Sequence, residues 1–444
     1  MIPRVRPHKP SVSTFLEGYE LEIIHRFCAG IDVHKAMAMV CVRRLEGKRV
    51  RSLVRQFGTM THDILEMADW LKSNGVTHVA MESTGVLWKP IYNLLEGQFE
   101  LVLCNPHHMK QIPGKKTDVK DCEWICQLTQ FGLLKASFVP KRELRDIRDL
   151  TRHRAQLVDE KTRIANRIHK VLQDANVKLS SVASDVLGVS GRHMIRAIIS
   201  GEKDPVVLAD LARRQLRRKI PELERALLGG ISEHHRFMLE RLFGHLQFLE
   251  AEIDKLASRV DDEMRTSDAK SGQANGDSIP FRLAVQMADK VPGIDICTAE
   301  NILAEIGTDM RQFPTAKHLA SWAGICPGNH ESAGKRKGGK SSKGNRWLRR
   351  AMSQAAWAAS RTKNTYFAAQ YRRLVGRRGK KRAIIAVAHS LLTVLYHMLA
   401  TSSPYSELGP DFFDKLSPER TKRYHVRRLQ SLGYHVTLEA TIPA

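Results

Sequence analysis

The feature that most constrains the fold is a series of strand-like and helix-like segments over residues 27–131. Three short β-rich segments come first, at 27–33, 36–44 and 49–57, and Gly47 marks the turn between the second and third. Amphipathic and apolar segments then alternate, which predicts helices at 62–72, 87–96 and 119–131 and strands at 77–81 and 100–104. Strands in a meander followed by alternating helices and strands favour an α/β domain with a mixed sheet.

Four acidic residues stand at the ends of these segments. Asp32, in Gly-Ile-Asp-Val-His-Lys, and Glu82, in Ala-Met-Glu-Ser-Thr-Gly, each end an apolar, strand-like run. Asp118 and Asp121 lie three residues apart in a lysine-rich stretch and share one helical face. Carboxylate oxygens suit Mg²⁺, and two divalent ions about 4 Å apart can activate a nucleophile and stabilise a leaving oxygen. The four acids therefore predict a two-metal magnesium site for nucleic-acid phosphates, although each acid alone is also explained as a helix cap or surface charge.

The net charge of +24 indicates a polyanionic partner. Between Ser332 and Arg382 the chain has seventeen Lys and Arg residues, no Asp or Glu, and several interleaved aromatic residues. Cations that follow a groove and rings that stack on bases are typical of nucleic-acid surfaces. The basic residues expected to contact nucleic acid are Lys115, Lys116, Lys120, Lys335, Arg336, Lys337, Lys340, Lys343, Arg346, Arg349 and Arg350.

A basic surface also suits anionic lipid, but no run of about eighteen apolar residues that would span a bilayer is evident. The first ten residues lack the apolar segment of a secretory signal. Seven scattered cysteines fit a reducing cytosol, and Cys122 and Cys126 are expected to be packed core thiols rather than zinc ligands. We therefore expect a cytoplasmic protein with no membrane partner.

The residues after 140 change character. Leu and Ile recur at intervals of three, four or seven over 141–265, which predicts two long helices in an antiparallel hairpin or an intermolecular coiled coil, with an ordinary helical bundle as the alternative. The expected organisation is an N-terminal extension at 1–26, a catalytic domain at 27–140, a helical coiled-coil region at 141–265, a linker at 266–285, a C-terminal domain at 286–400 and a tail of unassigned function at 401–444.

The segment Val291-Pro-Gly-Ile-Asp-Ile resembles a helix-hairpin-helix element. In that element the Pro-Gly turn offers backbone N–H groups to a DNA phosphate, so Gly293 is a further candidate for nucleic-acid contact. The alternative is a structural turn between two packed helices.

A candidate nucleophile opens the basic segment. Ser332 stands in a loop rich in glycine and cations, from His330 to Lys340. Positive potential stabilises an alkoxide and attracts a scissile phosphate, although a serine in a basic loop is often only a solvent-exposed residue.

Together these motifs resemble those of the DEDD transposases of bacterial insertion sequences, a family that includes the pilin-gene invertases and the bridge-RNA-guided recombinases. The N-terminal motifs are Gly-Ile-Asp-Val-His-Lys, Glu-Ser-Thr-Gly, Asn-Pro-His-His-Met-Lys and Lys-Thr-Asp-Val-Lys-Asp. The C-terminal motifs are Val-Pro-Gly-Ile, Leu-Ala-Ser-Trp-Ala-Gly-Ile-Cys-Pro and Glu-Ser-Ala-Gly-Lys, and the resemblance spans roughly residues 28–400.

The resemblance implies a RuvC-like, ribonuclease-H-type N-terminal domain, a helical coiled-coil insert and a mostly helical C-terminal transposase domain. The four acids of the family correspond to Asp32, Glu82, Asp118 and Asp121. Its catalytic serine corresponds best to Ser332, although Glu-Ser-Ala-Gly replaces an Asp-Ser-Gly-like loop. Ser321 is the rival, disfavoured because it lies in an apolar run that resembles core.

The resemblance further implies DNA cleavage and rejoining through a covalent phosphoserine, with Mg²⁺ at the acids. It implies a noncoding guide RNA that pairs with target and donor DNA, a homo-oligomer (a dimer or tetramer), and a location in the bacterial cytoplasm at the nucleoid.

Two other functions compete with transposition. The first is a structure-specific endonuclease, such as a junction resolvase, with the same acids and a water nucleophile. The second is a non-enzymatic nucleic-acid-binding protein whose acids balance charge. The four-acid pattern argues against the second, and the serine loop argues against the first.

Overall fold

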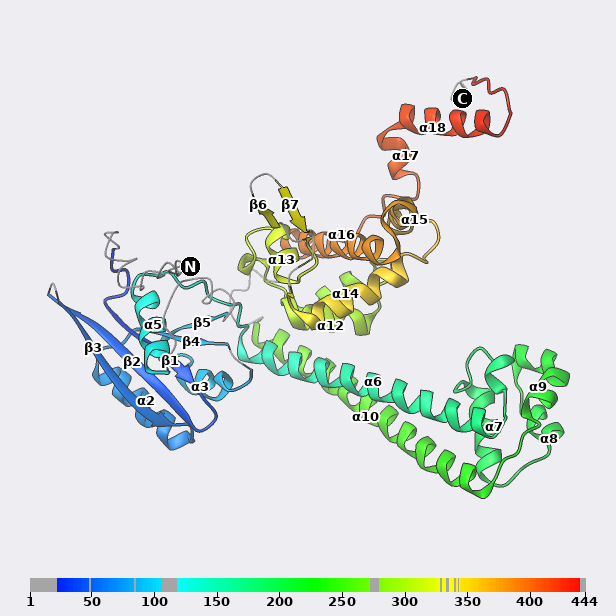
Figure 1. The fold of residues 1–444 in the computed structure, drawn as a ribbon, viewed down its shortest axis with the longest axis horizontal. Helices are drawn as coiled ribbons and strands as arrows, with labels where there is room; N and C mark the ends of the chain where they lie inside the picture. Colours follow the sequence, from blue (N-terminus) through cyan, green and yellow to red (C-terminus); the bar gives the residue numbers. More distant parts are fainter. Residues whose placement is uncertain are drawn as a thin grey trace, which may run out of the picture. The chain divides into compact units, whose positions relative to one another are not determined.

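The computed structural model describes residues 22–47, 49–83, 85–105, 118–271, 279–327, 330–332, 335–338, 341 and 343–439. Within these ranges, the side chains of 118–120, 271, 330–332, 335–338 and 420 lie outside the description. The chain divides into two compact units, with the boundary in the sequence between Val139 and Pro140, and each is described by itself (Figure 1).

The first unit is built on a five-stranded sheet of order β3-β2-β1-β4-β5. β1, β2 and β3 form an antiparallel meander, whereas β4 runs parallel to both β1 and β5. The strands are β1 Phe27–Val33, β2 Met37–Glu46, β3 Arg49–Gly58, β4 His78–Glu82 and β5 Glu100–Cys104. The predicted mixed α/β domain is confirmed, and the strand ends differ from the sequence prediction by no more than two residues.

Helices cover both faces of this sheet. On one face, α2 (Thr61–Ser73) and α3 (Trp88–Leu95) pack on the alternate β1 residues Ala29 and Ile31. On the other face lies α5 (Asp118–Gln130), which packs on β1, β2 and β4. The alternation arises because successive strand side chains point to opposite sides.

The contact between α5 and the sheet is lined by thiols. Cys122 and Cys126 of α5 are fully buried against Cys28 of β1 and Cys41 of β2. All four are free cysteines, and the sulfur atoms of Cys28 and Cys126 lie 3.9 Å apart. All four act as small apolar core groups, which confirms the prediction made for Cys122 and Cys126.

The second unit begins with a long helical hairpin. α6 (Arg142–Asp174) and α10 (Glu233–Ser271) run side by side and antiparallel, so this packing is intramolecular (Figure 1). Short helices close the far end of the hairpin over a core that includes Ile168 and Leu246. These helices are α7 Val189–Ile199, α8 Pro205–Asp210 and α9 Ile220–Leu227.

The rest of the second unit is mostly helical. Its helices are α11 Phe281–Asp289, α12 Ile296–Ile306, α13 Ala316–Trp322, α14 Arg346–Ala359, α15 Tyr366–Arg378, α16 Lys380–Thr401, α17 Phe412–Leu416 and α18 Pro418–Ser431. The stretch 266–285, expected as a linker, is helical at both ends because α10 extends to Ser271 and α11 begins at Phe281; residues 272–278 lie outside the described ranges.

Helix α16 differs from the expectation that no segment is long and apolar enough to span a bilayer. Its length and mean hydropathy of 1.8 satisfy that criterion, and half of its apolar window is buried. The helix contacts α11, α13, α14 and α15, so its apolar residues form the core of this helical group.

The Pro-Gly turn of the helix-hairpin-helix-like element joins α11 to α12. Gly293 has a φ of +87°, and a Cβ there would lie 2.4 Å from the Ala359 nitrogen and 2.5 Å from the Ala355 oxygen. Packing against the α14 backbone therefore explains the glycine, which agrees with the structural-turn alternative.

Candidate carboxylate site and basic surface

Two of the predicted acids meet at one edge of the sheet. The parallel pairing of strands β1 and β4 ends at the pair Ile31–Met81, so Asp32 and Glu82 are the next residues on neighbouring strands. Side-chain alternation places Asp32 on the same face as Gly30, and Glu82 on the same face as Ala80. Because Gly30 and Ala80 both pack against α5, the two carboxylates point toward the face that α5 covers.

Helix α5 brings a third acid to this place. A Cβ at Gly30 would lie 2.5 Å from the Cys122 oxygen, so the first turns of α5 rest directly on β1. Asp121 immediately precedes Cys122. Burial raises the pKa of Asp32, and the negative charges of Asp121 and Glu82 raise it further. The structure therefore brings three of the four predicted acids together. Asp118 starts α5, one helical turn earlier, and its side chain lies outside the description.

His34 is a member of this site that the sequence interpretation missed. Its Nε2 lies 3.1 Å from Oδ2 of Asp32, and the Asp32 side chain is 15% exposed. His34 directly follows β1, two residues after Asp32, and the spacing Asp-x-His was the available sequence signal. The histidine opposes the rise in the pKa of Asp32 that burial and the other acids cause.

The floor of the site is uncharged. Burial, with the negative charge of Glu82 as a smaller cause, raises the pKa of Cys104 to about 12. Burial also raises the pKa of Cys122 to about 12, and Asp32 is among the smaller causes. Both thiols are therefore protonated near neutral pH, and the acids supply the negative charge.

The chemistry of these donors fits a hard divalent cation. Three carboxylates that repel one another are costly without a cation, and Mg²⁺ prefers oxygen ligands. As they stand, no three His, Cys, Asp or Glu side chains within the described set, which omits the Asp118 side chain, are arranged to hold a metal ion.

The structure changes the comparison of the two candidate serines. Ser332 ends β6 (His330–Ser332), which pairs with β7 (Lys335–Gly338), so these residues form a strand pair where the sequence predicted a loop. The Ser332 side chain lies outside the description. The expectation that Ser321 lies in core is wrong, because Ser321 is exposed on α13 while Leu319 and Ala320 are buried. An isolated apolar run does not show which face of a short helix is solvated.

Of the basic residues predicted to contact nucleic acid, some are exposed and others are engaged in contacts within the protein. Lys343 and Arg346 are exposed at the start of α14. Arg350, in contrast, forms a bidentate ion pair with Asp159 of α6, with N–O distances of 2.5 and 2.7 Å. Arg349 is partly buried and engaged in other contacts. Lys115, Lys116 and Lys340 lie outside the described residues, as do the side chains of Lys120, Lys335, Arg336 and Lys337.

A separate cluster of cations lies around the junction of α15 and α16. All seven are exposed, and none forms an ion pair within the described part of the chain: Arg372, Arg373, Arg377, Arg378, Lys380, Lys381 and Arg382. The sequence count of basic residues included them, but the predicted contact residues did not.

Comparison with known proteins identifies the family. A transposase family model matches residues 29–177, and a model described as the transposase IS116/IS110/IS902 family matches residues 285–372. The chain belongs to this transposase family. The four acids lie within the first matched segment, and both candidate serines lie within the second.

Curated relatives agree with this family. A probable family 20 transposase of Pseudomonas aeruginosa is 25% identical over 381 residues, which is 85% of this chain and 94% of the relative. An insertion element IS110 protein of Streptomyces coelicolor is 27% identical over 67% of this chain and 74% of its own length. A pilin gene-inverting protein of Moraxella bovis is 32% identical over 120 residues, which is 26% of this chain and 37% of the relative.

Proposed function

We propose that this chain is the transposase of a bacterial insertion sequence and that it cleaves and rejoins DNA. The convergence of Asp32, Glu82 and Asp121 on one face of the sheet carries the proposal, because these acids lie in a segment that matches a transposase family. The strand order β3-β2-β1-β4-β5 supports a RuvC-like, ribonuclease-H-type domain for the first unit.

In this proposal, Asp32, Glu82, Asp118 and Asp121 would hold Mg²⁺, which would supply positive charge beside a scissile phosphate. The protein orients these ligands by packing α5 tightly on β1. His34 contacts Asp32 and favours its ionised form, which is the form that offers oxygen ligands. The buried, protonated thiols beneath the acids keep that floor of the site apolar.

We infer that a serine of the second unit is the nucleophile, with Ser332 as the first candidate. Its hydroxyl oxygen loses its proton and bonds to phosphorus, and the bond from phosphorus to the bridging deoxyribose oxygen breaks. That oxygen takes up a proton and leaves as a hydroxyl, and the resulting phosphoserine ester conserves the energy for rejoining. The lysines and arginines around β6 and β7 support this choice, since positive potential stabilises an alkoxide. Ser321 is the second candidate because it is exposed.

A noncoding guide RNA and a homo-oligomer, dimer or tetramer, complete the proposal. The exposed cations near Lys343 and around the α15–α16 junction support polyanion binding in general. RNA transcribed from the flank of the element is the proposed guide, and the bacterial cytoplasm, at the nucleoid, is the proposed location.

Formation of the element junction in cells tests the proposed function. We expect the wild-type chain to produce joined element ends that are detectable by amplification, and Asp32→Asn to produce none at the same protein level. Equal junction formation by both proteins would contradict the role of the acids. Cleaved but never rejoined ends would favour the resolvase-like endonuclease, and intact DNA with normal binding would favour the binding protein.

A trapped DNA–protein adduct identifies the nucleophile. The protein is incubated with Mg²⁺, flanking RNA and labelled junction DNA, and the adduct is digested for peptide mapping. We expect the modified peptide to contain Ser332 and the adduct to vanish in Ser332→Ala while persisting in Ser321→Ala. The reverse pattern would assign Ser321, and cleaved DNA without any adduct would overturn the covalent mechanism.

A further inference from the structure

A cavity of about 140 Å³ lies in the second unit between α6, α12 and α14. Ala155 and Val158 of α6 and Ala351 of α14 supply apolar surface, and Trp347 supplies an aromatic ring. A cavity of about 150 Å³ in another protein accommodates benzene, so this volume suits one flat ring.

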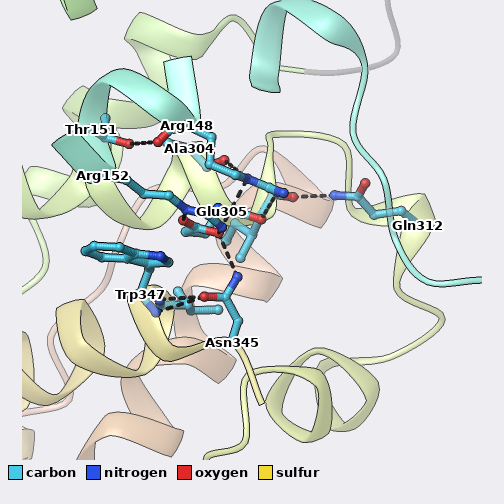
Figure 2. A network of polar contacts seen from close by, with 10 residues as sticks. Arg148, Thr151, Arg152, Ala304, Glu305, Gln312, Asn345 and Trp347 are labelled. Atoms are coloured by element: carbon cyan, nitrogen blue, oxygen red, sulfur yellow. Dashed lines mark hydrogen bonds and ion pairs between the residues drawn. The ribbon is translucent and has the colours of Figure 1, made fainter. Parts of the chain in front are cut away.

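A buried network fixes the walls of the cavity. Glu305 of α12 is 1% exposed and accepts hydrogen bonds from Arg152 at 2.7 and 2.8 Å and from Nδ2 of Asn345 at 2.6 Å. Asn345 also caps α14, because its Oδ1 accepts from the backbone nitrogens of Trp347 and Leu348. Figure 2 shows that Arg152 from α6 and Trp347 from α14 flank this same carboxylate. One acid thus holds the walls together, and the site is formed before a ligand arrives.

The charges around the cavity argue against an anionic ligand. Three arginines line it, and each already has a carboxylate partner: Arg152 with Glu305, Arg154 with Glu300, and Arg350 with Asp159. A phosphate would have to compete with these buried or partly buried ion pairs, which are costly to break. The groups left to recognise a ligand are the aromatic ring, the apolar wall and uncharged polar groups such as the Gln354 amide and Nδ2 of Asn301; Oδ1 of Asn301 already accepts a hydrogen bond from Arg154.

That combination suits a nucleobase. Unstacked bases are recognised by stacking on aromatic or guanidinium planes and by hydrogen bonds to their edges. The guanidinium of Arg346 lies 4.8 Å from the centre of the Trp347 ring, so the indole already accepts a planar group. Arg346 is exposed and lies outside the cavity lining, so it need not leave the ring for a base to enter. Arg152 does line the cavity, and its guanidinium lies 5.8 Å from the centre of the same ring, so the cavity presents both an aromatic and a guanidinium plane.

We propose that this cavity receives one unstacked base of the nucleic acid that the transposase binds. The proposal rests on the nucleic-acid partner of the proposed function and adds a specific contact. The basic residues near Lys343 hold the backbone, whereas the cavity holds a base, so this contact distinguishes single-stranded or distorted nucleic acid from a regular duplex.

Fluorine NMR of the full chain labelled with 5-fluorotryptophan tests the cavity directly. The chain has six tryptophans, and Trp347→Phe assigns the Trp347 resonance. The probes are the four uncharged deoxyribonucleosides and, separately, inorganic phosphate. We expect at least one nucleoside to shift the Trp347 resonance saturably, and phosphate to leave it unchanged. Trp357, on the same helix but outside the cavity lining, serves as the internal control.

A blocking variant completes the test. Ala155→Leu fills the cavity and is expected to abolish the nucleoside shift, whereas the adjacent exposed change Gln156→Leu is expected to preserve it. No shift with any nucleoside, an equal shift with phosphate, or a shift that survives Ala155→Leu would each overturn the proposal. Nucleoside binding in a chain that forms no element junctions would overturn the proposed function alone. Junction formation without nucleoside binding would overturn only the base cavity.

Discussion

Replacement of Gly30 by alanine is expected to displace the helix that carries Asp121. An alanine Cβ at this position would lie 2.3 Å from the Cys126 nitrogen, 2.5 Å from the Cys122 oxygen and 2.8 Å from the Cys126 Cα. All three atoms belong to the α5 backbone, so no side-chain rotation can relieve the overlap. Ordinary van der Waals contact begins near 3.4 Å, and α5 must therefore move away from β1 by roughly 1 Å.

Two effects of opposite sign set the stability change. Overpacking of a core costs about 1–3 kcal/mol, whereas exchange of glycine for alanine lowers the entropy of the unfolded chain and returns about 0.4–1 kcal/mol. We expect Gly30→Ala to lower the free energy of unfolding by about 1–2 kcal/mol. The displacement also separates Asp121 from Asp32, and a shift of about 1 Å in a catalytic group can cost about 100-fold in rate.

Urea unfolding and the rate of DNA cleavage measure these two effects. Gly47→Asn is the matched control, because Gly47 lies in the turn between β2 and β3 of the same unit, has open space around it and adopts a left-handed φ of +60° that asparagine tolerates. We expect the control to change stability by less than about 0.5 kcal/mol and to retain activity. Wild-type stability and activity in Gly30→Ala would refute the close approach of α5 to β1.

Three further substitutions have expected outcomes. Asp121→Asn removes a negative charge that raises the pKa of Asp32, so carbon NMR titration should show a lower pKa for that carboxyl. Because this folded-state pKa is raised, protonation of Asp32 stabilises the fold at low pH, and the variant should lose less stability as pH rises through that range. Glu305→Gln leaves the partly buried Arg148 and Arg152 without their buried carboxylate and should cost up to about 3–5 kcal/mol in urea unfolding. A hydrogen bond from Arg192 is the main cause that lowers the pKa of Glu250 to about 2, so the stability lost in Glu250→Gln should be present at neutral pH and vanish as pH falls toward 2.

Much of the first unit was predictable because its signals are local. Alternating apolar residues, the turn at Gly47 and the amphipathic helices fixed the element order, and the acids at the strand ends followed from it. The contact of α5 with β1 was not predictable in this way, since it depends on a glycine 92 residues before Cys122. His34 was missed although its Asp-x-His spacing was visible, because the spacing alone does not show that the imidazole contacts Asp32.

The second unit shows where sequence patterns fail. Arg350 belongs to a strongly basic segment, yet it pairs with Asp159, which is 191 residues away, and holds α14 against α6. The composition gives the number of basic residues but does not show which of them already form ion pairs with acidic residues. Ser321 is the converse case, because its apolar neighbours suggested core while the packing of α13 leaves the serine exposed.

Magnesium-dependent cleavage of junction DNA tests most directly whether the converging acids form one functional centre. The measurement compares the cleavage rates of wild type, Asp121→Asn and Asp69→Asn, where Asp69 is an exposed acid on α2, across the sheet from α5. We expect Asp121→Asn to reduce the rate by roughly 100-fold or more and Asp69→Asn to match the wild type. Equal rates for all three proteins would contradict a carboxylate centre built from Asp32, Glu82 and Asp121.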